Sequence, residues 1–248
     1  MLNARNTRIT FVILLFVPLL TKWNLNALSF YYGVLILIYM AVLFYGSYFI
    51  QSDFYIKALC KGDKRSKRIA ITFDDGPMKE FTPRLLDLLR KENVPASFFL
   101  IGKNISCNED LVKRMINEGH SIGNHSYSHT YWFSLNNAKT ITEDLKKCDE
   151  EIFKAIGEKP KMFRPPYGVT NPMVAKAVKN GNYDCIGWSI RTYDTNARRA
   201  DLLLQKSLKN LSNGDVILFH DWGKHTIGIL SDFIKEARSH GFEFARVD

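Results

Sequence analysis

Cysteine is scarce in this sequence, and its four copies form no pair. Cys60, Cys107, Cys148 and Cys185 are widely scattered and have none of the short spacings typical of a thiolate zinc site. The same scatter gives no indication of a disulfide framework. A fold built on cysteine ligands or disulfides is therefore not expected, and the cysteines do not indicate a cellular compartment.

Acidic residues are almost missing from the first 68 residues. This part holds nine Lys or Arg against Asp53 and Asp63, so it carries +7 of the total formal charge of +9. The excess lies beside an apolar segment, and the rest of the chain is close to neutral. Anionic membrane lipid is therefore the expected partner of the basic residues, and nucleic acid is not.

Formal charge is absent from residues 23–52. Within this run, residues 28–50 are long enough to span a bilayer, which needs about 20 apolar residues. A second apolar segment, residues 9–21, contains Pro18 and could be half of a hairpin, a re-entrant segment or the core of a signal peptide. No clear small-residue cleavage site follows it, so we expect residues 1–52 to be retained as a membrane anchor.

The rest of the chain alternates short apolar runs with helical patterns, which is typical of repeated βα units. It follows a basic linker at residues 53–67 and shows no internal repeat. Helices are expected over 82–92, with Thr82 as N-cap, from 108 toward 119, over 142–157, and from Asn171-Pro172. Seven strands are expected, at 68–73, 96–101, 121–124, 162–164, 183–189, 215–219 and 242–246. Together they predict an α/β domain over residues 68–248, in which seven βα units close or nearly close a parallel sheet into a (β/α)7-type barrel.

Polar clusters stand at or just after the carboxyl ends of these predicted strands. In parallel barrels the carboxyl ends share one mouth, where chemistry gathers. The clusters are therefore expected to face one another; they are Asp74-Asp75, His125 with His129, Arg164 to Tyr167, Asp194 and His220.

Two of these clusters have the composition of a metal site. His125 and His129 are four residues apart, which would put them on one face of a helical turn, and Asp75 could be a third ligand. Two imidazoles and one carboxylate leave coordination positions open, as a catalytic metal requires. The adjacent Asp74 would stay free to take a proton.

Four ordered motifs carry a family resemblance: TFDDGP at 72–77, HSYSH at 125–129, RPPYG at 164–168 and LFHD at 218–221. They resemble the NodB homology domain of the polysaccharide deacetylases, carbohydrate esterase family 4, over roughly residues 66–248. The resemblance implies a distorted (β/α) barrel. It also implies a metal-dependent hydrolase that removes N-acetyl, or sometimes O-acetyl, groups from sugars.

The resemblance also assigns roles to single residues. Asp75, His125 and His129 would hold a divalent metal, with zinc expected, and no organic cofactor is implied. Asp74 would be the general base and His220 the acid that protonates the leaving amine. Three further residues would support them: Arg164 holds Asp74, Asp194 tunes His220, and the backbone N–H of Tyr167 binds the oxyanion.

One motif departs from the family pattern. The family commonly has an Asp-Trp pair after the fifth strand, but here Asp194 is followed by Thr195. The wall of the acetyl pocket and the acyl group accepted are therefore left open. Trp188, Tyr193 and Trp222 are candidates for the missing wall.

Three functions remain to be separated. The first is a membrane-anchored deacetylase of an envelope polysaccharide or peptidoglycan sugar; the second is a deformylase or deacetylase of a lipid-linked aminosugar. The third is an inactive glycan-binding membrane protein, against which the full set of acid, base and metal residues argues. Basic residues after the span favour a cytoplasmic catalytic domain, whereas the implied substrate favours the extracytoplasmic side, which we expect.

Overall fold

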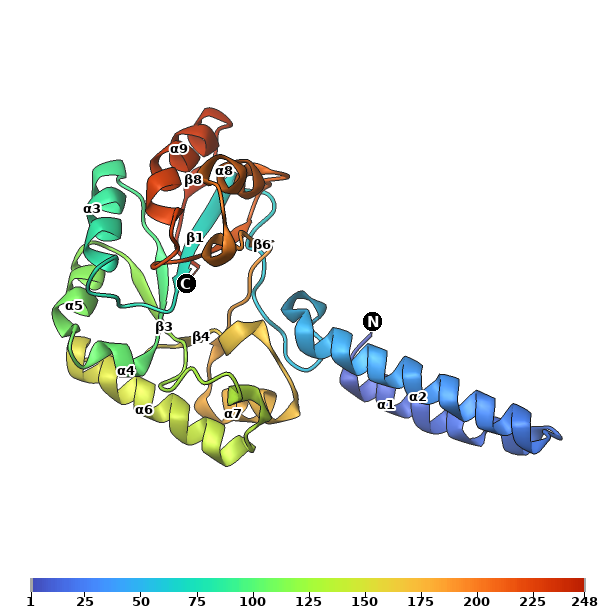
Figure 1. Cartoon of the computed structure of the whole chain (residues 1–248). Helices are drawn as coiled ribbons and strands as arrows, with labels where there is room; N and C mark the ends of the chain where they lie inside the picture. The colour runs from blue at the N-terminus through green and yellow to red at the C-terminus, as the bar shows by residue number, and fades with distance from the viewer. Residues whose placement is uncertain (1, 248) are drawn as a thin grey trace.

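An apolar helical hairpin at the N-terminus projects from an α/β domain, as Figure 1 shows. The computed structural model describes residues 2–247, so the predicted outer limits Met1 and Asp248 lie outside the described residues. The hairpin consists of α1 (Ala4–Phe16), the short helix η1 (Val17–Leu20) and α2 (Leu25–Tyr48). A further short helix, η2 (Ile50–Ser52), leads from α2 toward the α/β domain.

The two helices of the hairpin contact each other along their length. The Tyr31 hydroxyl donates to the carbonyl oxygen of Leu14 at 2.7 Å, near the far end. At the base, the Ala4 N–H donates to the carbonyl oxygen of Phe54 at 3.0 Å. The segment at residues 9–21 therefore belongs to a hairpin, with the chain's beginning and the α/β domain at the same end.

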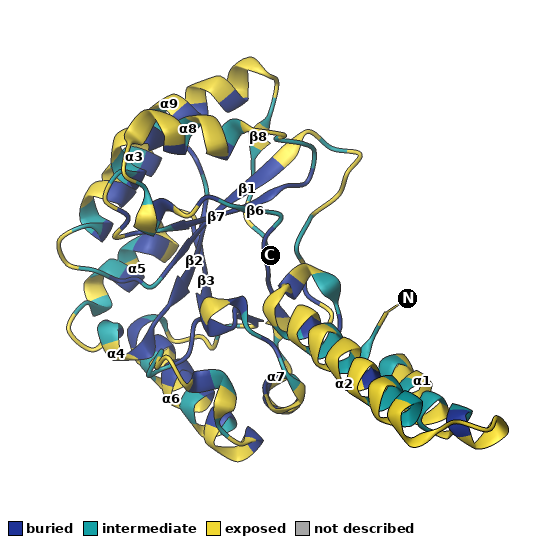
Figure 2. Ribbon diagram, turned by 45° about the vertical axis from the view of Figure 1, so that its right-hand side comes forward, coloured by how far each residue is buried: buried dark blue, intermediate teal, exposed yellow. Residues whose placement is uncertain are grey.

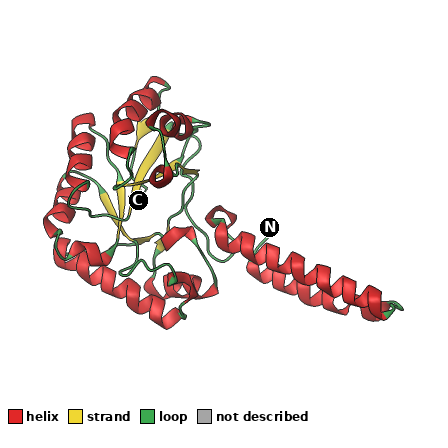
Figure 3. Ribbon diagram, in the orientation of Figure 1, coloured by secondary structure: helices red, strands yellow, loops and turns green. Residues whose placement is uncertain are grey.

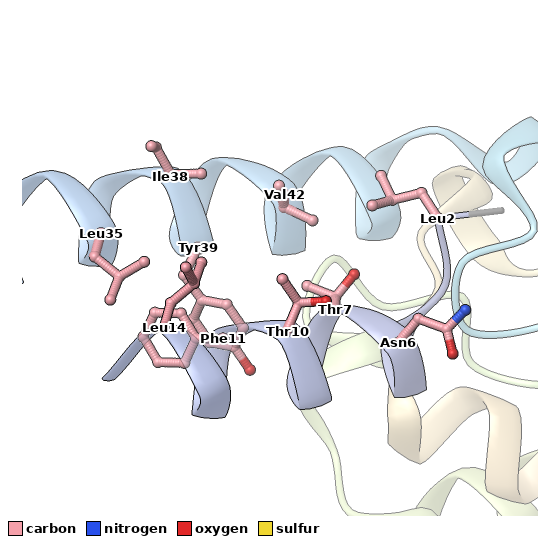
Figure 4. A pocket seen from close by; sticks show the side chains of 10 residues that line it. All are labelled: Leu2, Asn6, Thr7, Thr10, Phe11, Leu14, Leu35, Ile38, Tyr39 and Val42. Carbon is pink, nitrogen blue, oxygen red and sulfur yellow. The ribbon is translucent and has the colours of Figure 1, made fainter. Parts of the chain in front are cut away.

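Only α2, among the helices within residues 2–247, is long and apolar enough to cross a membrane by length and composition. Its 24 residues extend about 36 Å, against a hydrocarbon core of about 30 Å. An apolar groove of about 410 Å³ lies between α1 and α2 (Figure 4). Its lining contains no acidic, basic or histidine side chain.

The α/β domain is built on a curled sheet of parallel strands, which Figure 3 shows in yellow at the centre of the domain. The order in the sheet is β5-β4-β3-β2-β1-β7-β6, and β8 pairs with the beginning of β1. The strands are β1 (Arg68–Asp74), β2 (Ser97–Leu100), β3 (Ser121–Asn124), β4 (Met162–Phe163), β5 (Asp184–Cys185), β6 (Ile190–Arg191), β7 (Val216–His220) and β8 (Glu243–Phe244).

Helices cover the outer face of this sheet, and its central strands β1, β2, β3 and β7 are mostly buried, as Figure 2 shows in dark blue. The helices are α3 (Thr82–Glu92), α4 (Gly102–Ile105), α5 (Glu109–Asn117), α6 (Ala138–Ile156), α7 (Pro172–Gly181), α8 (Ala200–Leu208) and α9 (Thr226–Ser239). Parallel strands alternating with helices confirm the predicted α/β barrel class, in the form of an open half-barrel.

One predicted strand is wrong. Residues 183–189 do not form a single strand; β5 and β6 are separate and lie at opposite edges of the sheet. Between them the chain leaves the sheet, because the Gly187 N–H donates to the carbonyl oxygen of Leu59 at 3.0 Å. Leu59 and Lys61 also form bridges to Ile186 and Asp215. Part of the predicted basic linker is thus built into the open seam of the barrel.

The predicted cap of the first domain helix is also wrong. Thr82 lies inside α3, after an N-cap residue, Phe81, that makes no side-chain cap bond. The Thr82 hydroxyl instead donates to Asp221 Oδ2 at 2.5 Å and accepts from the Met78 N–H. This buried contact ties the loop after β1 to the loop after β7, because Thr82 and Asp221 follow those two strands.

Candidate active site

Adjacent carboxylates at the end of β1 face different partners. Asp74 is the last residue of the strand, and Asp75 takes a left-handed backbone conformation with φ of 77°. Asp74 Oδ1 accepts from Arg164 at 2.7 Å, while Asp75 Oδ1 lies 3.4 Å from His129 Nε2. Both acids also lie near His125 Nε2, Asp74 Oδ2 at 3.7 Å and Asp75 Oδ1 at 3.6 Å, so they share one imidazole and differ in their other partners.

Arg164 is fully buried beneath the cleft. Its guanidinium donates to Asp74, to the Thr72 hydroxyl at 2.8 Å and to the carbonyl oxygen of Gly187 at 2.8 Å. The guanidinium carbon also lies 4.0 Å from the centre of the Phe99 ring. A buried charge is stable only when it is paired and hydrogen-bonded. Arg164 therefore forms a buried ion pair with Asp74 and is not part of the surface.

Asp75, His125 and His129 come together as a group that fits a metal ion. Their potential ligand atoms all lie within 4.8 Å of one another. Asp75 Oδ1 is 3.6 Å from His125 Nε2 and 3.4 Å from His129 Nε2. Tetrahedral zinc, with bonds of about 2.0–2.1 Å, separates its ligand atoms by about 3.3 Å. The donor set and its spacing therefore suit a divalent ion.

The two histidines do not lie on a helical turn, which corrects the interpretation of their spacing. His125 follows β3 directly, and the chain then turns through Ser126 and His129, both with positive φ. Their rings approach to 4.8 Å because this loop folds back on itself. The Ser126 hydroxyl accepts from the His129 N–H at 2.9 Å and stabilises the turn.

Hydrogen bonds and burial prepare both imidazoles as ligands. His125 Nδ1 lies 2.8 Å from the carbonyl oxygen of Arg164, which makes Nδ1 the donor and leaves Nε2 free. Burial and the neighbouring His125 lower the pKa of His129 to about 4, so that ring is neutral at physiological pH. Burial opposes ionisation of Asp75, but His125, His220 and His129 outweigh it and lower the pKa of this carboxyl.

His220 stands at the end of β7 and is oriented by Asp194. Its Nδ1 lies 2.8 Å from Asp194 Oδ1, and its backbone N–H donates to Asp194 Oδ2 at 2.7 Å. Asp194 is itself buried and accepts from the Thr226 hydroxyl at 2.6 Å. Burial would lower the pKa of His220, but the bond to Asp194 and the nearby carboxylates raise it. The protonated imidazolium is therefore favoured, with Nε2 left for another partner.

Tyr167 also lines the cleft, and its backbone has a left-handed conformation with φ of 59°. Its ring lies 4.9 Å from the ring of His129. The next residue, Gly168, has φ of 72°, and a Cβ there would come within 2.3 Å of Trp188. Glycine is thus required at this position because the Trp188 ring packs directly against the backbone.

These residues line one cleft of about 290 Å³. Trp188, Tyr193 and Trp222, the three candidates for the missing pocket wall, all line it, and so does Thr195. The cleft is therefore walled by aromatic rings although Thr195 stands where the family has tryptophan. The full lining is Asp74, Asp75, His125, His129, Tyr167, Gly168, Trp188, Arg191, Tyr193, Thr195, Asn196, Leu218, His220 and Trp222.

Two contacts were missed by sequence reasoning. The Trp222 indole N–H donates to Asp75 Oδ2 at 2.8 Å, which fixes the second oxygen of the predicted metal ligand. Trp222 lies two residues after His220, which indicates a position near the cleft but not the bond to Asp75. Thr226 reaches Asp194 across 32 residues of sequence, and no local pattern indicates such a contact.

A curled parallel barrel with an Asp-His-His group and a second carboxylate at its mouth has the composition of a metal-dependent hydrolase. A family model described as polysaccharide deacetylase matches residues 61–186, just over half of the chain. The chain belongs to this family, as the four motifs predicted.

Relatives and solved structures agree with this assignment. Peptidoglycan-N-acetylglucosamine deacetylase PgdA of Listeria monocytogenes is 36% identical over 185 residues, which cover 75% of this chain and 39% of PgdA. The chain thus spans about two fifths of the length of that relative.

Among structures, the Bc1960 peptidoglycan N-acetylglucosamine deacetylase superposes with a TM-score of 0.72 at 35% identity, covering 76% of this chain and 89% of that one. BA3943 of Bacillus anthracis is a pseudoenzyme of carbohydrate esterase family 4. It superposes with a TM-score of 0.71 at 26% identity, and the match covers 76% of this chain and 66% of BA3943. The shared fold therefore includes both active and inactive proteins.

Proposed function

We propose that the protein removes N-acetyl groups from aminosugars of peptidoglycan by metal-assisted hydrolysis. The observation that carries the proposal is the division of labour between Asp74 and Asp75 inside one cleft. Asp75 faces two imidazoles, and Asp74 is held by Arg164 with one oxygen free of that bond. Pure binding of a glycan needs neither group, so the arrangement favours catalysis.

Each residue of the cleft has a task in this reaction. A divalent metal held by Asp75, His125 and His129 would acidify a water and polarise the acetyl carbonyl. Asp74 takes the proton from the attacking water, and the hydrogen bond from Arg164 holds this carboxylate in place. The Tyr167 N–H donates to the carbonyl oxygen as it gains charge, and Trp222 holds the second oxygen of Asp75.

His220 completes the reaction by protonating the leaving amine. The raised pKa of His220 keeps a proton available, and Asp194 holds Nδ1 so that the proton leaves from Nε2. Without this proton an amine is a poor leaving group. The base and the acid therefore line the same cleft and act at opposite ends of the bond that breaks.

The glycan substrate is supported by exposed aromatic rings beside the cleft. Tyr131 and Trp132 are 72% and 63% exposed, and the Tyr131 ring lies 5.9 Å from that of Tyr167. Flat rings at the mouth of a cleft suit the apolar faces of sugar units. PgdA and Bc1960, named above, act on peptidoglycan N-acetylglucosamine, which is the sugar we propose.

We further propose that the hairpin anchors the protein in a membrane, with the catalytic domain on the extracytoplasmic side, where peptidoglycan lies. The exposed apolar surface of α2 supports insertion. The basic residues at the base of the hairpin favour the opposite side under the positive-inside rule. Accessibility of a C-terminal reporter from outside the cell tests this; a reporter active only in the cytoplasm contradicts it.

Mass spectrometry of reaction products tests the activity. The purified full chain is incubated with N-acetylglucosamine oligomers, peptidoglycan fragments carrying N-acetylmuramic acid, and a formylated lipid-linked aminosugar. Each reaction is run with and without a chelator, and zinc is then restored. Loss of acetyl from peptidoglycan sugars, abolished by chelator, is expected. Activity on the formylated sugar alone supports a deformylase, and activity on none supports a glycan-binding protein.

A further inference from the structure

The end of α2 contacts the loop that carries Tyr167. Thr170 lies three residues after Tyr167, and its N–H donates to the carbonyl oxygen of Ser47 at 3.0 Å. Its hydroxyl donates to the carbonyl oxygen of Gly46 at 3.3 Å. Both carbonyls belong to the last turn of α2, where a helix has no partners of its own for these oxygens. The loop of the candidate active site therefore caps the helix of the hairpin.

The residues that follow α2 contact Trp188, whose ring packs against the same loop at Gly168. Ile50 is 3% exposed and belongs to a core cluster that includes Trp188 and Leu218. The Gln51 side-chain amide donates to the carbonyl oxygen of Trp188 at 2.7 Å. Because the Trp188 ring packs against Gly168, these contacts also act on the backbone next to Tyr167.

We propose that residues 46–51, the α2 exit, are a positioning element of the catalytic cleft. They fix Trp188 and the Tyr167 loop from two sides, so the hairpin sets the geometry of the cleft in addition to any anchoring role. The inference rests on the proposed deacetylase function for the chemistry of the cleft. The family model begins at residue 61, so the α2 exit lies outside the part of the chain that it matches.

The metal group offers an internal reference for this proposal. Asp75 is fixed by Trp222, His125 by the carbonyl oxygen of Arg164, and the His129 backbone by the Ser126 hydroxyl. Although the His129 ring lies 4.9 Å from that of Tyr167, no hydrogen bond within residues 2–247 joins these three residues to the α2 exit. Removing contacts of the α2 exit should therefore lower the rate of deacetylation and leave metal affinity unchanged. General destabilisation of the domain would change both.

Substitutions in the full chain, purified in detergent micelles, test the proposal. Gln51→Ala and Thr170→Val each remove side-chain hydrogen bonds, and Ile50→Ala empties a buried site. We expect each to lower kcat/KM on N-acetylglucosamine oligomers about tenfold, because small misplacements of catalytic groups are costly. Ile50→Val should restore most of the activity, since it keeps the branched shape.

Control variants remove a threonine hydroxyl and a buried isoleucine side chain from helices that lie outside the α2 exit and the cleft. Thr142→Val deletes a hydroxyl that bonds to the carbonyl oxygen of Ala138 within α6, and Ile234→Ala empties a buried site in α9. These should lower the melting temperature to a similar degree with kcat/KM nearly unchanged. Equal losses of activity in the controls and at the α2 exit would overturn the proposal.

A spectroscopic measurement separates this inference from the proposed activity. With 5-fluorotryptophan incorporated, the ¹⁹F resonance of Trp188, assigned with Trp188→Phe, should shift in Gln51→Ala and Ile50→Ala. The resonances of Trp23 and Trp132 should stay in place, and zinc affinity should match the original chain. An unmoved Trp188 resonance refutes the positioning role. If the original chain deacetylates no sugar, the proposed function fails, and the fluorine shift still decides whether the α2 exit positions Trp188.

Discussion

The hairpin and the α/β domain use apolar residues in opposite ways. Of the 30 exposed large apolar side chains among residues 2–247, 19 lie within residues 2–49. The α/β domain instead buries its apolar residues in three clusters beneath the helices. Figure 2 shows the contrast as a mainly yellow hairpin beside a domain with a dark blue centre.

This difference shows what each region needs from its surroundings. The α/β domain supplies its own apolar environment, so its polar groups can be fixed in a shielded cleft. The hairpin leaves its apolar surface uncovered by the chain, and large exposed apolar surfaces mark a site for lipid or a partner. The two regions meet at the α2 exit, where Ile50 is buried in a core cluster of the α/β domain.

The largest expected effect belongs to the α/β domain alone. Asp74→Asn removes the proposed base and should lower kcat about 1,000-fold, since general base catalysis contributes about 100- to 10,000-fold. Zinc affinity and membrane association should not change, because Asp74 is not among the proposed ligands. Glu143→Gln, an exposed change on α6, is the control. Full activity in Asp74→Asn would eliminate the proposed mechanism.

The next effect belongs to the hairpin alone. Leu37 is 70% exposed near the middle of α2, and a lysine there costs about 2.5–3.5 kcal/mol in a bilayer. Leu37→Lys should shift the ratio of membrane-bound to soluble protein about 100-fold, as measured by flotation with vesicles. Leu202→Lys, an exposed leucine on α8, is the matched control. Unchanged flotation of Leu37→Lys would mean that lipid does not cover this surface.

A pH profile probes the acid of the cleft. Asp194→Asn removes the negative charge that helps to raise the pKa of His220 and leaves only a neutral acceptor, while burial continues to lower it. The pKa of His220 should fall, so the protonated acid is lost at a lower pH. The alkaline limb of kcat/KM should move to lower pH, with about a tenfold loss of activity at the optimum. Asp201→Asn is the control, and an unmoved limb in Asp194→Asn would refute His220 as the acid.

The smallest effect compares exposed apolar groups in the two regions. Trp132→Ala should raise KM for a glycan oligomer about 2- to 10-fold, because aromatic contacts contribute about 0.5–1.5 kcal/mol. Flotation with vesicles should not change, since Trp132 belongs to the α/β domain. Phe30→Ala on α2 should instead weaken flotation with vesicles and leave KM for the glycan oligomer unchanged. A KM that is equally insensitive to both changes would remove Trp132 from the proposed sugar site.

Local sequence patterns predicted most helices and strands of the α/β domain. The predictions were wrong where a distant segment forms hydrogen bonds with the same backbone groups. β1, β3 and α3 were predicted nearly to the residue, because apolar runs and turn residues are local signals. The strand at residues 183–189 was predicted wrongly because Leu59, more than a hundred residues away, takes the hydrogen bond of Gly187. The helical turn at His125 failed because positive φ values at Ser126 and His129 are set by the loop's contacts.

The sequence by itself determined the family, the α/β class, the candidate metal, base and acid residues, and the existence of a long apolar segment. These follow from motif order, from apolar periodicity and from an uncharged run, all of which can be found along the chain. The tertiary structure alone decided how the parts meet: the burial of Arg164 below Asp74, the bond from Trp222 to Asp75, and the capping of α2 by Thr170. Buried polar groups must find partners wherever the fold brings them, and no local pattern encodes that choice.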